Sequence, residues 1–378
     1  MFDFFTYAVY LILLFTLIIS TKSFARRRKP ISDEITFLEE TKIDFKYLSV
    51  LIFISFIVGY RYFVGVDWEG YVNDFNDFKL SLYKGFSSQY YEYGYYILTY
   101  FISEFNFGYE VLFSIVAYIS WFFIFKSVHA RILPMFIFFL FADEYFFWSM
   151  NGVRQFAAIS FWLISIRYII KRNLVKFILY VFLGSLFHKS LLVLIPIYYL
   201  PFNKLYNKKW WIIIYLFTVL LANVEVFSNF LRKFILFLGD SISIVNRYVR
   251  YIDSGRLESQ NTALGLGFYF KIGINLLIIL FSDKVIEMLP KLKIYFVLFF
   301  IGAVTFNVFY DFQLIGRFNH FFLINRALVL ALIYYFLIRN LRYKLILNGV
   351  VVLYFVLFLY SIYKSSNMCN PYNLTFFQ

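Results

Sequence analysis

Charge and cysteine are scarce in this chain of 378 residues. Charged residues make up 15% of it, hydrophobic residues make up 62%, and the mean hydropathy is +0.72. A soluble fold of this size does not need so much apolar surface, so the composition excludes a soluble fold and predicts an all-α polytopic membrane protein. The single cysteine, Cys369, forms no intramolecular disulfide and no cysteine metal cluster.

The motifs of soluble enzymes are also lacking. The sequence has no P-loop, HExxH, GxSxG or paired CxxC, and Gly265-x-Gly267 lacks the rest of a nucleotide fingerprint. It shows no internal repeat, no low-complexity tract and no separate soluble domain. We therefore predict one integral membrane domain over 1–378, without a cofactor or a metal site. The net charge of +14 is first a topology signal, so no nucleic-acid partner is expected.

What is present is a series of apolar runs, each near the roughly 20 residues that cross about 30 Å of hydrocarbon. Asp3 precedes the first run and a basic cluster follows it, which is the reverse of a cleaved signal peptide and predicts a membrane helix whose N-terminus lies outside. We predict about 12 transmembrane helices. They cover 2–20, 46–60, 108–126, 132–149, 154–170, 174–187, 190–203, 210–227, 263–281, 293–310, 317–338 and 344–364.

Loop charges fix the orientation. With the N-terminus outside, all six inner loops carry Lys and Arg clusters, as the positive-inside rule requires. Two larger periplasmic segments, 61–107 and 228–262, then lie outside, and the second is basic against the rule. Its charges indicate either an anionic ligand or an amphipathic helix on lipid headgroups, with equal weight. Residues 90–105 are too short to span, so we predict a helix at, or dipping into, the outer surface.

Arg154 and His188 give the strongest indication of a site. They lie on either side of the basic turn Lys171-Arg172, so both belong to the outer side, where ionisable groups at helix ends are costly and need a reason. The hairpin 173–203 covers about 45 Å as helix, against about 60 Å for two crossings. Its turn should therefore stop short of the surface and leave His188 below the headgroups.

These residue types suit transfer of a group from a pyrophosphate. Arginine forks bind phosphate oxygens bidentately, and a cluster of them can stabilise a pyrophosphate leaving group without a metal. A histidine or a carboxylate can take a proton from an attacking hydroxyl, and aromatic rings suit sugars. We predict catalytic roles for His188, Arg154, Asp67 and Glu92. We predict substrate binding by Arg61, Arg317, Tyr71, Trp68, Arg247 and Arg250.

Each of these residues has a plainer alternative. An arginine at a helix end commonly anchors to headgroups, and His188 could be a hydrogen-bonded packing residue. Asp67 could cap a short helix or pair with Arg61. The tyrosines of 90–96 are more often an interfacial belt than a sugar platform.

The same residues, in this order, resemble the EpsG-like branch of the Wzy-type polysaccharide polymerases over about 45–340. The blocks around Arg154 and His188 are the specific part, and the departures are Trp68, where Tyr is commoner, and Lys189 beside the histidine. The pattern is Arg61…Gly65-x-Asp67-Trp68-x-x-Tyr71, Glu92-x-Gly94-Tyr95, Asn151-Gly152-x-Arg154-Gln155-x-x-Ala158, Phe187-His188-Lys189-Ser190 and Gly316-Arg317.

The resemblance implies a GT-C-like glycosyltransferase of the bacterial inner membrane. Such proteins join oligosaccharide repeat units carried on undecaprenyl pyrophosphate, which is both donor and acceptor carrier, on the periplasmic face. A chain-length regulator in the membrane is a further partner that the resemblance implies. An O-antigen ligase, a lipid-linked oligosaccharide flippase and, more weakly, a membrane acyltransferase remain as alternatives. A flippase needs charges deep in several spans, whereas these charges concentrate at the outer edge, which favours chemistry.

Overall fold

The computed structural model describes residues 3–39, 44–81, 92–224, 266–310, 312–365 and 368–377, with 227, 230 and 233. This part of the chain is helical apart from its loops, and an isolated β-bridge joins Arg61 and Leu374. It divides into two compact units, the first formed by Met1–Leu200 with Tyr334–Gln378 and the second by Pro201–Ile333. The predicted all-α class is confirmed, while a single membrane domain stays a prediction.

Six helices of the described residues are long and apolar enough to cross a membrane. A seventh span arises if α7 (Leu133–Ala142) and α8 (Tyr145–Asn151), which are bent by 66° at their break, count as one. The membrane character is therefore confirmed, and the count of twelve and the GT-C-like arrangement stay predictions. The six are Phe4–Arg26, Tyr109–Ser127, Val153–Ile170, Pro290–Val308, Ile315–Leu337 and Leu341–Lys364.

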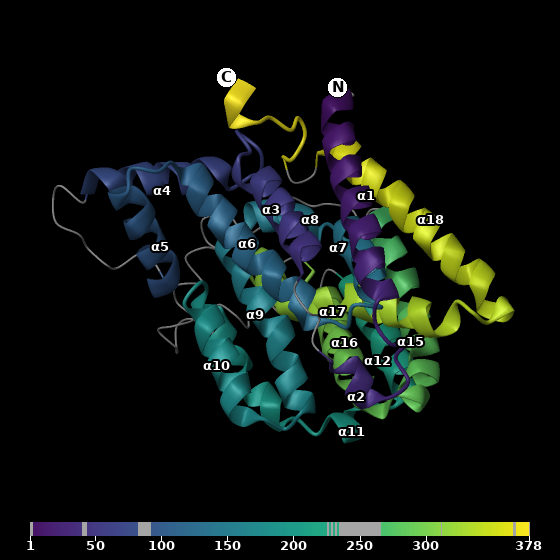
Figure 1. Cartoon of the computed structure of the whole chain (residues 1–378). Helices are drawn as coiled ribbons and strands as arrows, with labels where there is room; N and C mark the ends of the chain where they lie inside the picture. The colour runs from purple at the N-terminus through teal and green to yellow at the C-terminus, as the bar shows by residue number, and fades with distance from the viewer. Residues whose placement is uncertain are drawn as a thin grey trace. The chain divides into compact units, whose positions relative to one another are not determined.

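The first unit is built around α9, whose apolar stretch is 89% buried and so contacts neighbours on all sides. Helices pack side by side from the N-terminal helix to the hairpin, as Figure 1 shows. These are α1 (Phe4–Arg26), α3 (Phe45–Gly59), α6 (Tyr109–Ser127), α9 (Val153–Ile170) and α10 (Leu174–Ser185).

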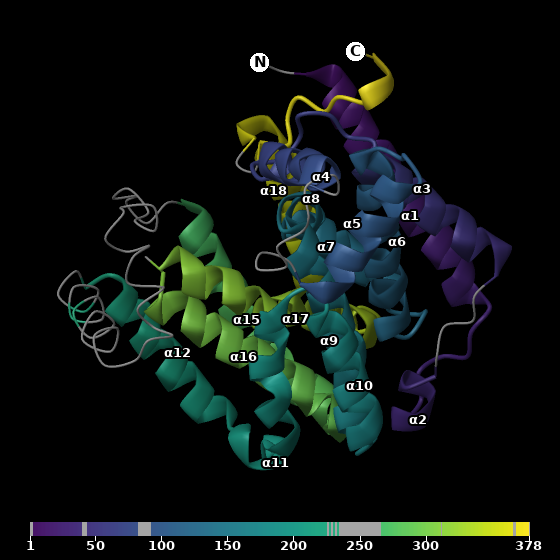
Figure 2. The ribbon, with the colours of Figure 1, turned by 90° about the vertical axis from the view of Figure 1, so that its left-hand side faces the viewer.

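Further elements surround this row of helices. In Figure 2, α4 (Trp68–Ser81) and α5 (Tyr93–Glu104) lie together beside α6. Helices α7 and α18 (Leu341–Lys364) pack against α1, and the single turns α2 (Glu34–Phe37) and η3 (Thr375–Phe377) complete the unit. At 12 residues, or about 18 Å, α5 is too short to span, as predicted for 90–105.

One predicted span has another shape. The run 132–149, predicted as one span, forms α7 and α8 with a bend between them. The charged pair Asp143-Glu144 interrupts the apolar run, and Glu144 adopts the left-handed conformation with φ of 67°. A non-glycine residue rarely takes this conformation inside a helix, so the chain changes direction there.

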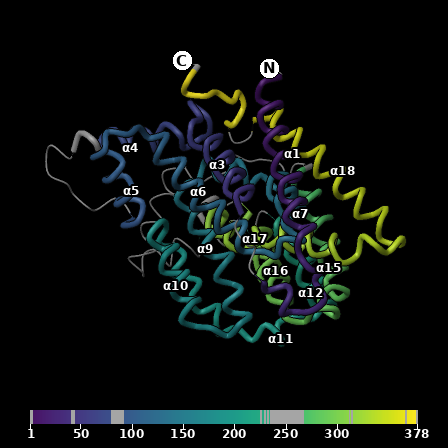
Figure 3. The backbone as a smooth tube through the Cα atoms, in the orientation of Figure 1, coloured from purple at the N-terminus to yellow at the C-terminus, as the bar shows by residue number. Residues whose placement is uncertain are grey.

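The hairpin after α9 has the predicted short form. Asn173 begins α10 by accepting a hydrogen bond from the Lys176 backbone N–H at 3.0 Å. The return arm is the 3-10 helix η1 (Lys189–Tyr199), which contains Pro196. The two arms measure about 18 Å and about 22 Å, so each is shorter than the roughly 30 Å hydrocarbon layer. The tube of Figure 3 shows α10 beside α9, and His188 directly precedes η1.

The basic loops of the first unit gather at one end of α9. Arg131 Nε donates to the Arg28 carbonyl at 2.8 Å, and an Arg167 nitrogen donates to the Lys126 carbonyl at 2.6 Å. Arg167 lies near the C-terminal end of α9, whereas Arg154 lies at its N-terminal end, about 20 Å away along the axis. Loops that the charge pattern assigns to the inner side are thus together, and Arg154 is at the opposite end.

The second unit holds α11 (Phe202–Leu205), α12 (Lys208–Ala222), α15 (Leu266–Met288), η2 (Pro290–Leu292), α16 (Lys293–Val308) and most of α17 (Gln313–Leu337). Helix α12 packs against α15 and α16. Amide side chains join these helices, since Asn275 donates to the Tyr215 hydroxyl at 3.0 Å and Asn307 to the Thr218 hydroxyl at 3.1 Å. Nearly all of the predicted basic segment 228–262 lies outside the described residues.

Candidate functional site

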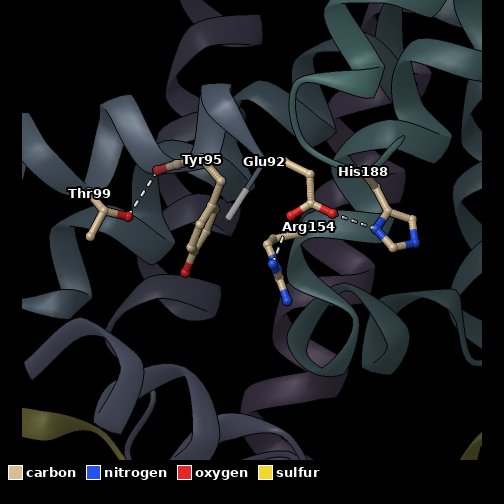
Figure 4. A network of polar contacts seen from close by, with 5 residues as sticks. All are labelled: Glu92, Tyr95, Thr99, Arg154 and His188. Atoms are coloured by element: carbon tan, nitrogen blue, oxygen red, sulfur yellow. Dashed lines mark hydrogen bonds and ion pairs between the residues drawn. The ribbon is translucent and has the colours of Figure 1, made fainter. Parts of the chain in front are cut away.

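Three of the residues predicted to be catalytic meet in the first unit, and we call Glu92, Arg154 and His188 the polar trio. A terminal nitrogen of Arg154 donates to Glu92 Oε2 at 2.8 Å, and His188 Nδ1 lies 3.3 Å from Glu92 Oε1 (Figure 4). The side chains of Arg154 and His188 are 27% and 34% exposed, so both can be reached from outside the protein. One carboxylate thus links two residues that the sequence placed on the same side.

Each member of the trio lies at the start of a helix. Glu92 directly precedes α5, Arg154 is the second residue of α9, and His188 directly precedes η1. Gly94 allows α5 to reach the hairpin: its backbone N–H donates to the Leu186 carbonyl at 2.9 Å, and a Cβ at this position would lie 2.8 Å from Leu186 Cβ. Any larger residue at 94 would push Glu92 away from His188.

Two tyrosine rings hold the Arg154 guanidinium. Its central carbon lies 5.6 Å from the ring centroid of Tyr71 on α4 and 5.6 Å from that of Tyr95 on α5, within the range of cation–π attraction. Figure 4 shows Tyr95 beside Arg154, with the Thr99 hydroxyl donating to the Tyr95 carbonyl at 2.9 Å. Tyr71 was predicted from sequence, whereas Tyr95 was only part of the motif around Glu92.

Glu92 is ionised at neutral pH. Burial raises the pKa of its carboxyl, but the hydrogen bond from His188 and the charge of Arg154 oppose burial and bring the pKa below its ordinary value. An ionised carboxylate can only accept hydrogen bonds, so His188 Nδ1 must carry the hydrogen that lies between them. The lone pair of the neutral ring is then on Nε2, which points away from Glu92.

Asp74 is a carboxylate near the site that the sequence did not single out. It lies one helical turn after Tyr71 on α4. Burial raises the pKa of Asp74, the Arg154 charge acts against this, and the neighbouring Asp77 adds to it. The signal that could have found it is its spacing of three residues from Tyr71, which puts both on one face of the helix.

Arg61 and Trp68, both predicted to bind substrate, lie in the core. Arg61 is 0% exposed, and its three nitrogens donate to the backbone carbonyls of Val58, Val64 and Met150. Burial lowers its pKa to about 10. Trp68 is 6% exposed and its ring nitrogen donates to the Arg61 carbonyl at 3.1 Å. Both side chains stabilise the loop before α4, and substrate binding by them stays a prediction.

The remaining predicted residues are Asp67, Arg317, Arg247 and Arg250. Asp67 directly precedes α4, and in the described part of the chain its carboxylate makes no hydrogen bond or ion pair with the trio. Arg317 is exposed and belongs to the second unit. Arg247 and Arg250 lie outside the described residues. The convergence of several arginines on one ligand stays a prediction.

Comparison with protein families matches residues 45–374 to a model described as the EpsG family. Comparison with curated proteins and with solved structures gave no match. The matched range includes the polar trio and the loop that contains Arg61 and Trp68, and it leaves out α1.

Proposed function

The chain belongs to the EpsG family, whose members are relatives of the Wzy-type polysaccharide polymerases, and from this we propose that it is an O-antigen or capsular polysaccharide polymerase. It joins oligosaccharide repeat units carried on undecaprenyl pyrophosphate, at the periplasmic face of the inner membrane. The observation that carries this proposal is the polar trio, which lies at the end of α9 opposite the basic loops.

The proposed reaction is a glycosyl transfer between two lipid-linked glycans. A sugar hydroxyl of the acceptor attacks the anomeric carbon of the donor, and the bond from that carbon to the pyrophosphate oxygen breaks. The hydroxyl proton goes to His188 Nε2, and undecaprenyl pyrophosphate leaves with the bonding electron pair. The donor glycan is then attached to the acceptor, which remains on its own carrier.

Arg154 binds the pyrophosphate in this proposal. Glu92 occupies only one of its terminal nitrogens with a hydrogen bond at 2.8 Å, and its side chain is 27% exposed, so other N–H groups can face phosphate oxygens. The rings of Tyr71 and Tyr95 limit the orientation of the guanidinium plane. A planar group held in this way can form two parallel hydrogen bonds to a phosphate, which a lysine cannot.

Glu92 orients His188, and His188 is the base. A carboxylate whose pKa is lowered is a weak proton acceptor, but it fixes the tautomer of a histidine and stabilises the imidazolium that forms. This division of roles leaves Asp67 as the alternative base only if the loop before α4 moves toward the trio.

The proposed mechanism needs no metal, because Arg154 supplies the positive charge at the leaving group. A chelator should leave the rate of the purified protein unchanged. Inhibition by the chelator that a divalent cation reverses would contradict this part of the proposal.

The function is tested by deleting the gene in its host and separating the surface glycan on a gel. Single repeat units on the lipid core are the expected result for a polymerase. Polymer that remains on its carrier would indicate a ligase, and loss of every outer-face unit would indicate a flippase. Re-expression of the wild-type chain should restore the polymer ladder, and re-expression of Arg154→Lys at the same level should not.

A further inference from the structure

Asn151 connects the segment that leads to Tyr71 with the segment that leads to Arg154. It is the last residue of α8, lies three positions before Arg154, and is 3% exposed. Its Oδ1 accepts a hydrogen bond from the Val66 backbone N–H at 2.5 Å, and its Nδ2 donates to the Phe147 carbonyl at 3.1 Å. One amide side chain therefore joins the loop before α4 to the turn between α8 and α9, which we call the corner.

The loop approaches Asn151 so closely because residue 65 is glycine. Gly65 has φ of +104°, a conformation that L side chains rarely adopt, and a Cβ there would lie 2.9 Å from Asn151 Oδ1. The Arg61 side chain adds a second connection between the same segments, since it donates to the Met150 carbonyl at 2.7 Å. Residues of the loop and residues at the end of α8 therefore both contribute to this contact.

The C-terminal segment 368–377 contacts both the loop and Asn151. The Gly65 backbone N–H donates to the Met368 carbonyl at 2.7 Å, and Asn151 Nδ2 lies 3.9 Å from Cys369 Sγ. Farther along, the Tyr62 N–H donates to the Asn373 carbonyl at 2.9 Å. The C-terminal segment, almost 220 residues after Asn151, therefore holds the loop against the corner.

The two segments joined by Asn151 carry the two sides of the arginine site. The loop continues after two residues into α4, whose first turn carries Tyr71, and the corner continues into α9 with Arg154. Tyr71 and Arg154 lie 5.6 Å apart, from ring centroid to guanidinium carbon. A shift of the loop relative to the corner would change this distance directly.

We propose that Asn151 is a positioning residue that fixes Tyr71 relative to Arg154, and that the segment 368–377 is part of the same support. The proposal rests on the proposed function, because it assigns the position of Arg154 to the binding of a pyrophosphate. Asn151 itself is buried and does not contact the substrate.

The test compares Asn151→Ala with Asn151→Asp in the full-length protein. The alanine removes the acceptor for the Val66 N–H, whereas the aspartate keeps an oxygen in the same place. We expect Asn151→Ala to lower kcat roughly 100-fold with a much smaller change in KM, because small misplacements of a binding group have effects of this size. Asn151→Asp should recover a substantial part of kcat. Asn340→Ala, which removes the cap of α18 elsewhere in this unit, should leave kcat unchanged.

A double-mutant cycle separates positioning from a loss of structure. If Asn151 acts through Tyr71, then Asn151→Ala should cost less than about 3-fold in a Tyr71→Ala background, because the effects of coupled residues are not additive. If the fold-losses in kcat of Asn151→Ala and Tyr71→Ala simply multiply in the double variant, the proposal is overturned. A wild-type kcat in Asn151→Ala would overturn it as well.

Amide hydrogen exchange gives a readout that does not depend on activity. Asn151→Ala should speed exchange in peptides that cover 65–74, and Asn151→Asp should do so much less. If Asn151→Ala speeds this exchange but the wild-type protein makes no polymer, the support stands and the proposed function is rejected. Unchanged exchange in Asn151→Ala would reject the support itself.

Discussion

Arg154 is held on three sides in the described structure. Glu92 provides a carboxylate at 2.8 Å, and Tyr71 and Tyr95 each provide a ring at 5.6 Å. A fully exposed arginine would lose side-chain entropy on binding a ligand, whereas this one is largely ordered beforehand. The remaining exposed N–H groups are therefore preorganised for an anion.

The first prediction concerns Glu92. Glu92→Gln removes the charge that pairs with Arg154 and replaces one of the two carboxylate acceptors with an NH2 donor, so the side chain no longer fixes the His188 tautomer. We expect a rate reduction of about 10²- to 10⁴-fold, the range of general acid–base catalysis. Steady-state rates on a lipid-linked repeat unit measure it, with Glu92→Asp as the control that keeps the charge and should retain more activity. Equal rates for Glu92→Gln and wild type would remove Glu92 from the mechanism.

The second prediction concerns His129, which lies in the loop between α6 and α7. Burial lowers its pKa to about 4 from an ordinary 6.5, and the charges of Arg167, Arg28 and Arg131 act in the same direction. The folded protein therefore holds His129 neutral, and its stability should fall as the pH drops from 6.5 toward 4, where the unfolded chain binds the proton more readily.

His129→Gln keeps an acceptor where His129 Nδ1 accepts from the Arg131 N–H at 3.1 Å, but it does not titrate. Thermal unfolding in detergent at pH 7.5 and pH 5 should show that the variant loses less stability between these two pH values than wild type does. Parallel losses in the two proteins would mean that His129 does not cause the pH dependence.

Elements with a long apolar run follow from the sequence, and short or bent ones do not. The run 154–170 corresponds to α9 (Val153–Ile170) and the run 344–364 to α18 (Leu341–Lys364), because about 20 apolar residues leave little choice but a membrane helix. Hydropathy does not encode the bend at Glu144 or the 3-10 form of η1, since both depend on local backbone conformation and packing.

The candidate site, like the helices, could be predicted only in part from the sequence. The sequence indicated that Arg154 and His188 share one side, because loop charges fix topology. It could not show that Glu92 joins them, since the two contacts cross 62 and 96 residues. Nor could a local pattern reveal that Arg61 is enclosed, because Met150 and the C-terminal segment that surround its loop are distant in sequence.

The third prediction tests the packing of α5 on the hairpin. Gly94→Ala places a Cβ 2.8 Å from Leu186 Cβ and 3.0 Å from the Leu186 carbonyl oxygen, so the start of α5 must move away. The contact between Glu92 and His188 should lengthen, and activity should fall roughly 10- to 100-fold. Gly70→Ala in α4 is the control, since its Cβ meets nothing within 4 Å. Equal activity of the two variants would show that the approach at Gly94 is not needed.

The whole molecule is a membrane protein whose first unit separates basic loops from the polar trio. Arg28, Lys126, Arg131 and Arg167 are joined at one end of α9, and Arg154 begins the other end. The trio therefore faces the outside if the basic loops face the cytoplasm. The side chain of the one native cysteine, Cys369, is buried, which leaves a low background for labelling.

The fourth prediction is the orientation itself. A cysteine introduced at Lys189, an exposed position beside His188, should react with a membrane-impermeant maleimide added to cells whose inner membrane is intact. A cysteine at Arg172, in the turn at the other end of α10, should react only after the membrane is opened. The reverse pattern would place the trio in the cytoplasm and contradict the proposed donor.

The most direct measurement of the central claim is polymer formation by the purified protein in liposomes. The only substrate supplied is one oligosaccharide repeat unit on undecaprenyl pyrophosphate. Wild type should produce a ladder of longer lipid-linked glycans and release one undecaprenyl pyrophosphate for each bond formed, while Arg154→Lys, inserted in equal amount, should produce neither. A wild-type protein that makes no ladder, or an Arg154→Lys protein that makes a full one, would contradict the account.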